Sequence, residues 1–194
     1  MHIDTDGGVD DAFALVMLAR SGVTIDAVSS VFGNTWVDQA ASNARMVLRQ
    51  AGCDVDVFVG AAAGVSGFTP DRGQRGHGED GLNGQGGSFR RKLPPLHRPH
   101  GMSRLVMAAR RGVRGLFLGP LTNLAEAILE DPVAFRGWRP LVMAGAFEVE
   151  GRGAGGADFN TWSDPEALQR LLANGALPRL VPLDVTSRVF LPRA

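Results

Sequence analysis

The order in which short apolar runs and amphipathic segments follow one another constrains the fold of this chain more than any other feature. The runs with the length and composition of buried strands are Ile25–Val31, Val55–Val59, Gly115–Leu118, Leu141–Ala144 and Leu180–Leu183. Between them, apolar residues recur at helical spacing in Asp10–Arg20, Val37–Gln50, Ser103–Arg111, Asn123–Glu130 and Pro165–Ala173. Strands that alternate with helices predict an α/β fold with an open, mostly parallel sheet and helices on both faces.

The composition is typical of one soluble folded domain. The chain has 194 residues, of which 44% are hydrophobic, enough for one substantial core. Its 20 basic and 20 acidic residues cancel, which argues against nucleic acid or an anionic membrane as the main partner. No apolar run reaches the roughly 20 residues of a membrane helix. The single Cys53 cannot form an internal disulfide and no signal-peptide pattern begins the chain, so we expect one cytoplasmic domain over residues 1–194.

One segment, Gly64–Pro99, breaks the alternation. It is rich in glycine and proline and has little apolar periodicity. Structureless segments of this length are uncommon unless they are functional, so we interpret it as a long irregular binding loop or lid. We expect it to be the least ordered part of the chain, with His77 near its centre facing the ligand crevice.

The strongest local signal is an aspartate cluster near the N-terminus, in which Asp4, Asp6, Asp10 and Asp11 fall within eight positions. If Met1–Thr5 is a strand, the last two begin the following helix. The helix dipole offsets only about half a charge, so the remaining carboxylates must be partly protonated or bind a cation. Oxygen ligands favour Ca²⁺ or Mg²⁺. The alternative is a helix cap beside solvated carboxylates, but their number at one junction favours a metal site.

Seven short blocks span nearly the whole chain. The first is Asp4-Thr5-Asp6-Gly7-Gly8-Val9-Asp10-Asp11-Ala12. The others are Gly33-Asn34-Thr35, His77-Gly78-Glu79-Asp80-Gly81-Leu82, Gly119-Pro120-Leu121-Thr122-Asn123-Leu124-Ala125, Val142-Met143-Ala144-Gly145-Ala146, Asp158-Phe159-Asn160 with Asp164-Pro165-Glu166-Ala167, and Pro182-Leu183-Asp184-Val185-Thr186. In this order they resemble the nucleoside N-ribohydrolases, the inosine-uridine preferring nucleoside hydrolase family, and the chain is identified as a member of it.

The resemblance implies calcium-dependent hydrolysis of the N-glycosidic bond of ribonucleosides to free base and ribose. It implies that Ca²⁺ is bound by the carboxylates of Asp6 and Asp11 and by the backbone carbonyl of Leu118. Asp6 would also be the catalytic base that takes a proton from the attacking water. The substrate-binding residues that the resemblance implies are Asp10, Asn34, His77, Met143, Asp158 and Asn160. Members of the family are commonly dimers or tetramers, so a homo-oligomer is expected.

The chain departs from the family pattern at several positions. Gly7 replaces a proline, Asp158 a glutamate, Arg152 an asparagine and Ala144 a glycine. The largest departure is length, because family members continue past Leu183–Thr186 with a stretch that supplies a His-Asp pair. We therefore expect a nucleoside hydrolase-like domain that is incomplete at its C-terminus, lacks roughly its last third, and hydrolyses nucleosides far more slowly than a complete member.

Two other functions fit parts of the sequence. One is a non-catalytic or degenerate nucleoside hydrolase-like protein that binds ribose or metal weakly. The other is a phosphotransferase of the haloacid dehalogenase type, because Asp4-Thr5-Asp6 resembles the nucleophile motif of that class. That class needs a lysine near the phosphate, and the only lysine, Lys92, falls in the irregular segment. The later blocks also have no place in that alternative, which makes it the weakest of the three.

Overall fold

The computed structural model of this protein describes residues 1–70, 74–86 and 101–189. Its centre is a sheet of six parallel strands in the order β3-β2-β1-β4-β5-β6. The strands are β1 His2–Thr5, β2 Ala27–Ser30, β3 Val57–Val59, β4 Gly115–Phe117, β5 Leu141–Met143 and β6 Arg179–Val181. The predicted α/β fold with a parallel sheet is confirmed.

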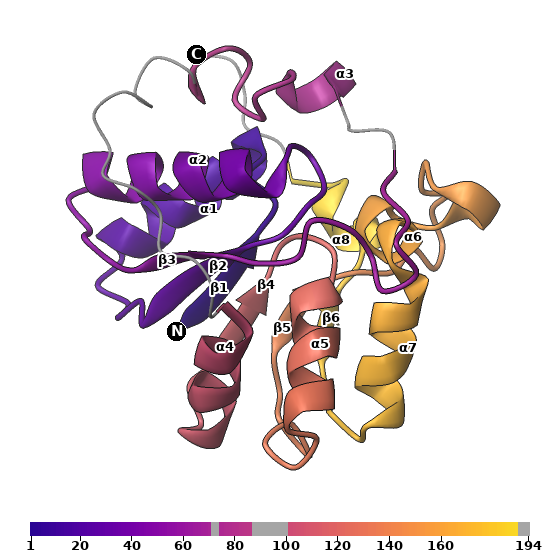
Figure 1. The fold of residues 1–194 in the computed structure, drawn as a ribbon. Coiled ribbons are helices and arrows are strands. Elements are labelled where there is room, and N and C mark those ends of the chain that lie inside the picture. The colour runs from indigo at the N-terminus through magenta and orange to yellow at the C-terminus, as the bar shows by residue number, and fades with distance from the viewer. Residues whose placement is uncertain (71–73, 87–100, 190–194) are drawn as a thin grey trace.

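Helices cover both faces of this sheet, with α1 and α2 on one face and α4, α5 and α7 on the other (Figure 1). The helices are α1 Val9–Arg20, α2 Val37–Gln50, α3 Gln74–His77, α4 Gly101–Arg110, α5 Thr122–Glu130, α6 Phe159–Ser163, α7 Pro165–Ala173 and α8 Leu183–Thr186, with a 3₁₀ turn at Ala154–Gly156. None of the described helices is long and apolar enough to cross a membrane.

Two separate hydrophobic cores hold these layers together. Ile3 and Val28, on the central strands, pack with α1 and α2 in one core. Phe117 and Val142 pack with α4, α5 and α7 in the other. Because successive side chains of a strand point to opposite faces, β4 contributes to both layers: Leu116 packs against the first core and Phe117 belongs to the second. The apolar run at β4 is therefore explained by burial on both sides.

The strand order also determines where a ligand crevice lies. From β1 the chain proceeds outward through β2 and β3, whereas β4, β5 and β6 follow one another on the other side of β1. The order therefore reverses between β1 and β4, and in open parallel sheets the crevice outside the carboxyl ends of the strands at such a point is the usual ligand site. Asp6 directly follows β1 and Leu118 directly follows β4.

Two interpretations of the sequence need correction. The segment Gly64–Pro99 is not irregular throughout, because it contains α3 and a hydrogen-bonded loop; its residues 71–73 and 87–99 lie outside the described ranges. In that loop the Asp80 carboxylate accepts from the backbone N–H groups of Leu82 (3.0 Å), Gly84 (2.8 Å) and Gly86 (2.7 Å). A loop held by side-chain bonds to the backbone has no periodic pattern of apolar residues, so the sequence does not show that it is ordered.

The second correction concerns the predicted strand Leu180–Leu183, which ends at Val181. Pro182 has no N–H to donate to a ladder, and Leu183 begins α8. This short helix places Asp184 where its carboxylate accepts from the backbone N–H groups of Phe147 (3.0 Å) and Glu148 (2.6 Å). The last block of the sequence therefore fastens the loop that follows β5.

Candidate active site

Asp6 is a buried carboxylate at the carboxyl edge of the sheet, with 1% of its surface exposed. The backbone N–H of Asn34 donates to its Oδ2 (2.9 Å), and the Asn34 side-chain amide donates to its Oδ1 (3.0 Å). Because Asn34 follows β2, these bonds join the carboxyl ends of two neighbouring strands. A Cβ at Gly33 or Gly119 would overlap the Asp6 side chain, so both neighbouring loops approach Asp6 as closely as glycine permits.

Asp11 lies beside Asp6, in the first turn of α1, and is 4% exposed. Its Oδ2 accepts from the backbone N–H of Gly8 (2.9 Å). Burial raises the pKa of Asp6 to about 6, although bonds from Asp11 and Asn34 act in the opposite direction. Burial raises the pKa of Asp11 well above its usual range, and the Asp6 charge adds to this. A hydrogen bond between the two carboxyl groups acts to lower the pKa of Asp6 and to raise the pKa of Asp11.

Asp10, which the resemblance assigned to substrate binding, lies outside this buried pair. Its side chain is 78% exposed, at the rim of the site. Successive residues of an α-helix point about 100° apart, so when Asp11 faces inward Asp10 must face outward. Its Oδ1 lies 3.7 Å from His77 Nδ1. In the described part of the chain no three His, Cys, Asp or Glu side chains converge as a metal-binding group.

The fourth aspartate of the cluster, Asp4, belongs to a different buried network. Its Oδ2 accepts from the Ser29 hydroxyl and from the Asn123 amide (2.6 Å), and the Ser29 hydroxyl also contacts His2 Nε2 (3.0 Å). Burial raises the pKa of Asp4 to about 7, against the effect of the Ser29 and Asn123 bonds. Asn123 also donates to the Ser30 carbonyl (2.8 Å), so this network links β1, β2 and the start of α5.

The donor atoms at Asp6 fit a hard cation. Two buried carboxyl groups side by side, whose mutual repulsion a cation would offset, supply only oxygen ligands, of the kind that Ca²⁺ binds. The Leu118 carbonyl, at the end of β4, is a third oxygen at the same edge. It already accepts from Asn160 Nδ2 (2.7 Å), which leaves it one further lone pair.

Asn160 and Met143 meet beside the Leu118 carbonyl. Besides that carbonyl, Asn160 Nδ2 contacts the Met143 backbone oxygen (3.0 Å) and the Met143 sulfur (3.2 Å). Asn160 is buried near the start of α6, and Met143 ends β5. Two predicted substrate-binding residues from separate blocks are thus in direct contact at the crevice.

Asp158 has a structural position in this chain. It is the N-cap of α6: its Oδ1 accepts from the backbone N–H groups of Asn160 (3.0 Å) and Thr161 (3.1 Å). Its Oδ2 accepts from the N–H of Gly145 (2.6 Å), and 1% of the residue is exposed. Three backbone donors therefore occupy the carboxylate that the resemblance assigned to the ribose.

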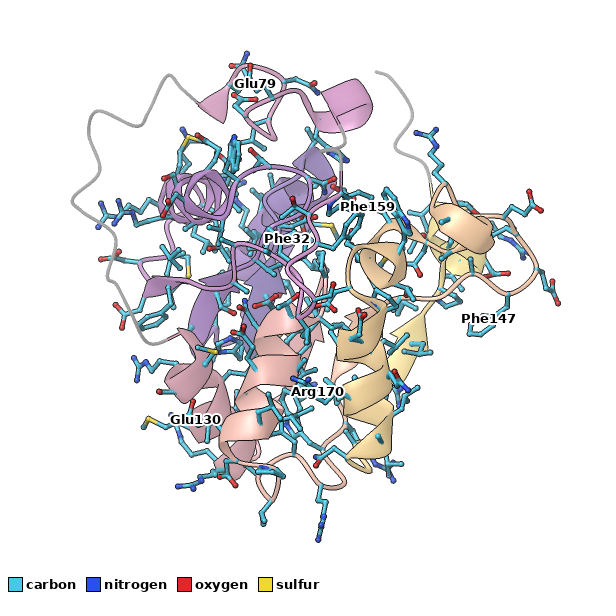
Figure 2. All side chains as sticks on the ribbon, turned by 45° about the vertical axis from the view of Figure 1, so that its right-hand side comes forward. Phe32, Glu79, Glu130, Phe147, Phe159 and Arg170 are labelled. Carbon is cyan, nitrogen blue, oxygen red and sulfur yellow. The ribbon has the colours of Figure 1, made fainter. Side chains whose placement is uncertain are left out.

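His77 lies beside the turn of Gly7 and Gly8 between Asp6 and α1, which we call the carboxylate turn. The backbone N–H of Val9 donates to its Nδ1 (3.1 Å), so in the neutral ring the proton is on Nε2, which is left as a hydrogen-bond donor. Figure 2 shows Glu79, in the same loop, and Phe159, in α6, at the end of the molecule where the strands finish, with Glu130 and Arg170 toward the other end. The predicted site residues therefore come from loops at one end of the sheet.

Sequence reasoning missed the residues that hold these loops in place. Asn43, Asn123 and Asp164 are buried, and each bonds to loops far away in the sequence. Asn123 and Asp164 belong to blocks that were recognised, so their positions were available, but only as part of a resemblance. Asn43 falls outside every block, and a polar residue among the apolar positions of its helix was the one available signal.

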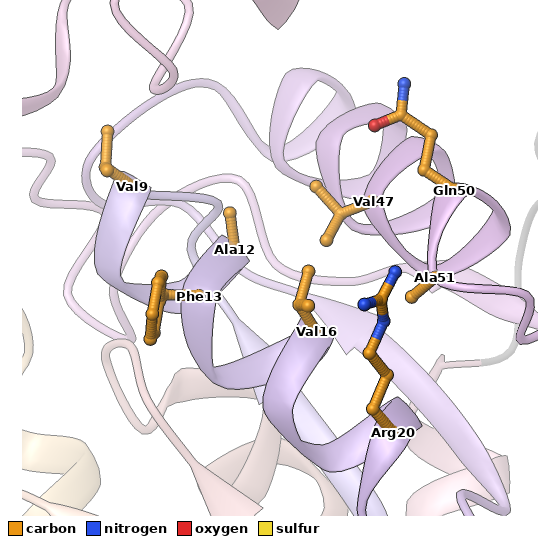
Figure 3. Close-up of a pocket in the computed structure, with 8 residues that line it drawn as sticks. All are labelled: Val9, Ala12, Phe13, Val16, Arg20, Val47, Gln50 and Ala51. Atoms are coloured by element: carbon orange, nitrogen blue, oxygen red, sulfur yellow. The ribbon is translucent and has the colours of Figure 1, made fainter.

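A groove elsewhere on the surface is not part of this site. It has a volume of about 430 Å³ and lies between α1 and α2, lined by Val9, Ala12, Phe13, Val16, Arg20, Val47, Gln50 and Ala51 (Figure 3). It is mostly apolar and contains none of the carboxylates of the aspartate cluster. The buried carboxylates that could bind an ion or act as a base lie instead at the carboxyl edge of the sheet.

The family of the chain follows from its sequence as well as from this geometry. The model of the inosine-uridine preferring nucleoside hydrolase family matches residues 1–194, so the chain belongs to that family. Among curated relatives, a probable uridine nucleosidase 1 of Oryza sativa subsp. japonica is 34% identical over 96% of this chain. A non-specific ribonucleoside hydrolase of Klebsiella pneumoniae is 30% identical over 97% of it.

Solved structures agree with this assignment. A plant nucleoside hydrolase superposes with a TM-score of 0.80 at 29% identity over 97% of this chain, and an inosine-guanosine nucleoside hydrolase with 0.80 at 26% over 96%. The fold of a purine-preferring ribonucleoside hydrolase from Gardnerella vaginalis superposes with a TM-score of 0.84. The chain spans 59% and 62% of the lengths of the two curated relatives and 61% of the plant structure.

Proposed function

We propose that this chain hydrolyses the N-glycosidic bond of ribonucleosides, releasing ribose and a free base. The observation that carries the proposal is the buried Asp6–Asp11 pair at the reversal point of the sheet. Two carboxyl groups held together in the interior are costly unless they bind a cation or a developing positive charge. Membership of a nucleoside hydrolase family and relatives named as ribonucleoside hydrolases support the same reaction.

The cofactor that we propose is Ca²⁺, held by Asp6, Asp11 and the Leu118 carbonyl. All three supply oxygen atoms, which a hard cation prefers to nitrogen or sulfur. When bound, such an ion keeps both carboxylates ionised and makes a neighbouring water easier to deprotonate. The alternative site of the haloacid dehalogenase type has little support, because Asp4 is fully buried and already bonded to Ser29 and Asn123.

In the proposed reaction Asp6 is the general base. The attacking water transfers a proton to the Asp6 carboxylate as its oxygen bonds to the anomeric carbon, and the bond from that carbon to the base nitrogen breaks with its electron pair leaving on the base. The released base takes a proton from solvent, and Asp6 returns its proton to solvent. The two Asn34 bonds hold that carboxylate in one orientation, so that it does not have to be ordered during the reaction. The positive charge that develops on the ribose is stabilised by the nearby carboxylates and amide oxygens.

The substrate-binding residues that we propose differ in how exposed they are. Asp10 is largely exposed and the His77 side chain is partly exposed, so both can reach a substrate without rearrangement. Asn34, Met143 and Asn160 reach the crevice but already bond to protein atoms, which a ribose hydroxyl would partly replace. Asp158 contacts ribose only if α6 gives up cap bonds, which makes it the least favourable member of the set.

We also propose that residues 1–194 form a single domain, that the protein is cytoplasmic, and that it forms a homodimer or homotetramer. Its one cysteine, Cys53, is free and half-buried, which agrees with a reducing compartment. Sedimentation velocity on the purified chain measures the oligomeric state. A monomer at all concentrations would contradict the last part of the proposal.

A second function has one observation in its favour. The Leu118 carbonyl is bonded to Asn160, and the described residues offer only two side-chain carboxylates to an ion, so the chain would bind metal or ribose weakly without catalysis. An assay of ribose release from inosine and uridine in calcium separates the two functions. Release that disappears in Asp6→Asn but persists in Asp54→Asn, which removes an equal charge from the exposed Arg49 ion pair, supports hydrolysis. No release from the parent chain, with calcium bound, supports the non-catalytic function.

A further inference from the structure

Asn43, in α2, joins two segments that are far apart in the sequence. It is 2% exposed, and its Nδ2 donates both to the Gly7 carbonyl (3.0 Å) and to the Asp80 carbonyl (2.8 Å). Its Oδ1 accepts from Gln39 Nε2 (2.7 Å), which fixes the orientation of the amide. A buried amide with both N–H groups in use cannot move without leaving polar atoms unpaired.

The three backbone segments around Asn43 are in very close contact. Gly7, the turn between Asp6 and α1, has φ of 77°, and a Cβ there would lie 2.6 Å from Ala40 Cα in α2. Gly81 has φ of 79°, and a Cβ there would lie 2.5 Å from the Gly7 carbonyl oxygen and 3.0 Å from Asn43 Nδ2. No side chain fits where the carboxylate turn, the loop and α2 meet.

The loop of residues 77–86 behaves as one unit in this contact. Three backbone N–H groups on the Asp80 carboxylate hold it together internally. It is tied to the rest of the molecule by Asn43 and by the Thr35 hydroxyl, which donates to the Glu79 carbonyl (2.9 Å), while Leu82 packs in the core formed with α1 and α2. If one polar tether is removed, the loop should shift without unravelling.

His77 begins this loop, and its place therefore depends on the same tethers. Its Nδ1 accepts from the N–H of Val9, which follows the carboxylate turn directly. This bond joins the loop to the turn but does not involve α2. The position of the loop relative to the turn therefore depends on the contacts that Asn43 and Thr35 make with it. The amide of Asn43 donates to both segments, to Gly7 in the turn and to Asp80 in the loop.

We propose that Asn43 is a positioning residue of the active site, which sets the 77–86 loop and its His77 against the turn that carries Asp6 and Asp11. The consequence for substrate binding rests on the proposed function, because it treats His77 as a substrate contact. The positioning itself does not depend on activity and can be measured in a chain that hydrolyses nothing.

Backbone hydrogen exchange, followed by NMR, tests the positioning. In Asn43→Ala the Val9 amide should exchange faster by about tenfold or more, since two bonds of ordinary strength are lost. The Gly84 amide, held inside the loop by Asp80, and the Leu118 amide, held in the sheet, should keep their rates. Ser42→Ala is the matched control, because that hydroxyl donates only to a carbonyl of its own helix.

Two further variants keep the proposal testable if Asn43→Ala folds poorly. Asn43→Asp keeps the size of the side chain but turns an oxygen toward two carbonyls, so the Val9 amide should exchange faster still. Thr35→Val removes the other tether without changing shape and should have a smaller effect of the same sign. Where ribose release is measurable, both should raise KM more than they lower kcat.

Two results would overturn the proposal. One is a Val9 rate within twofold of the Ser42→Ala control in all three variants. The other is a uniform acceleration that includes Leu118, which would mean that Asn43 supports global stability only. Failure of the proposed function has a different signature, since a parent chain that releases no ribose would still show the selective change at Val9.

Discussion

Two groups of aspartates in this protein differ in the groups that donate hydrogen bonds to their carboxylate oxygens. Asp6 and Asp11, at the end of β1, bond mainly to each other and to Asn34 and Gly8, and burial raises the pKa of both. Asp80 and Asp184, in loops, are surrounded by backbone N–H groups. Burial acts to raise the pKa of Asp80, but the N–H groups of its loop lower it overall, and two N–H groups lower the pKa of Asp184.

The difference shows how a carboxylate that could take part in catalysis or metal binding is distinguished from one that only stabilises the fold. Backbone donors stabilise the ionised form of a carboxylate and use part of its capacity to accept hydrogen bonds from a ligand. A buried pair without enough donors is unstable as two anions and is ready to exchange its proton for a cation. Asp158 is instructive, because its block predicts a ribose ligand whereas its three backbone bonds place it with the structural group.

The largest expected effect is on catalysis. Asp6→Asn should lower ribose release from uridine by about 10²- to 10⁴-fold, because the amide cannot accept the proton of the attacking water. Asp54→Asn, on the surface, should leave the rate unchanged. Initial rates in saturating calcium measure both variants. Equal rates in Asp6→Asn and the parent chain would show that Asp6 is not the general base.

Calcium should stabilise the folded chain through the same pair. At a free concentration about 100 times its dissociation constant, a ligand that binds only the folded state adds about 2.7 kcal/mol to the free energy of unfolding. Thermal unfolding with and without calcium should show this increase in the parent chain and little of it in Asp11→Ala. Calorimetric titration on both proteins checks the binding directly, and identical isotherms would contradict the assignment of Asp11.

A structural aspartate should show the reverse behaviour. Asp164 accepts from the N–H of Val65 (2.9 Å), the Thr122 hydroxyl (2.5 Å) and the N–H of Ala167 (3.1 Å). Asp164→Ala removes the cap of α7 and leaves buried donors unpaired, which should cost about 2 kcal/mol of stability. Urea unfolding measures this cost. Calcium affinity should stay within twofold of the parent value. A large loss of affinity would contradict the assignment of Asp164 to the structural group.

The smallest expected effect is the pH dependence that Asp80 contributes. A carboxyl group whose pKa is lower in the folded state than its ordinary 3.8 adds stability above that value and loses it as the pH falls through the folded-state pKa. Asp80→Asn should therefore be less stable than the parent chain near neutral pH and should approach it as the pH falls through the folded-state pKa, so the acid side of its stability curve is flatter. Urea unfolding between about pH 3 and 7 tests this; an unchanged acid limb in the variant would show that the loop bonds do not favour the ionised form.

Much of the fold could be predicted from the sequence because its signals are local. Val28, Phe117 and Val142 are completely buried in strands that the sequence shows as short, mainly apolar runs, and the helices between them have the matching period. The ordered structure of the loops was harder to predict. The loop at Asp80 is held by side-chain bonds to the backbone and by glycine turns, and neither produces a periodic pattern in the sequence.

The layered parallel sheet and a carboxylate cluster at the end of its first strand can both be predicted from the order of the residues. Which of those carboxylates pack against each other depends on how the chain folds. Asp10 and Asp11 are neighbours in the chain, but the helical turn points one outward and the other toward Asp6. Asp158 is committed to α6 by backbone donors that fold around it, and Asn43 gains its role from two carbonyls that are 36 and 37 residues away. The physical reason is that composition and period report burial, whereas the partners of a polar atom depend on which segments the packed layers bring together.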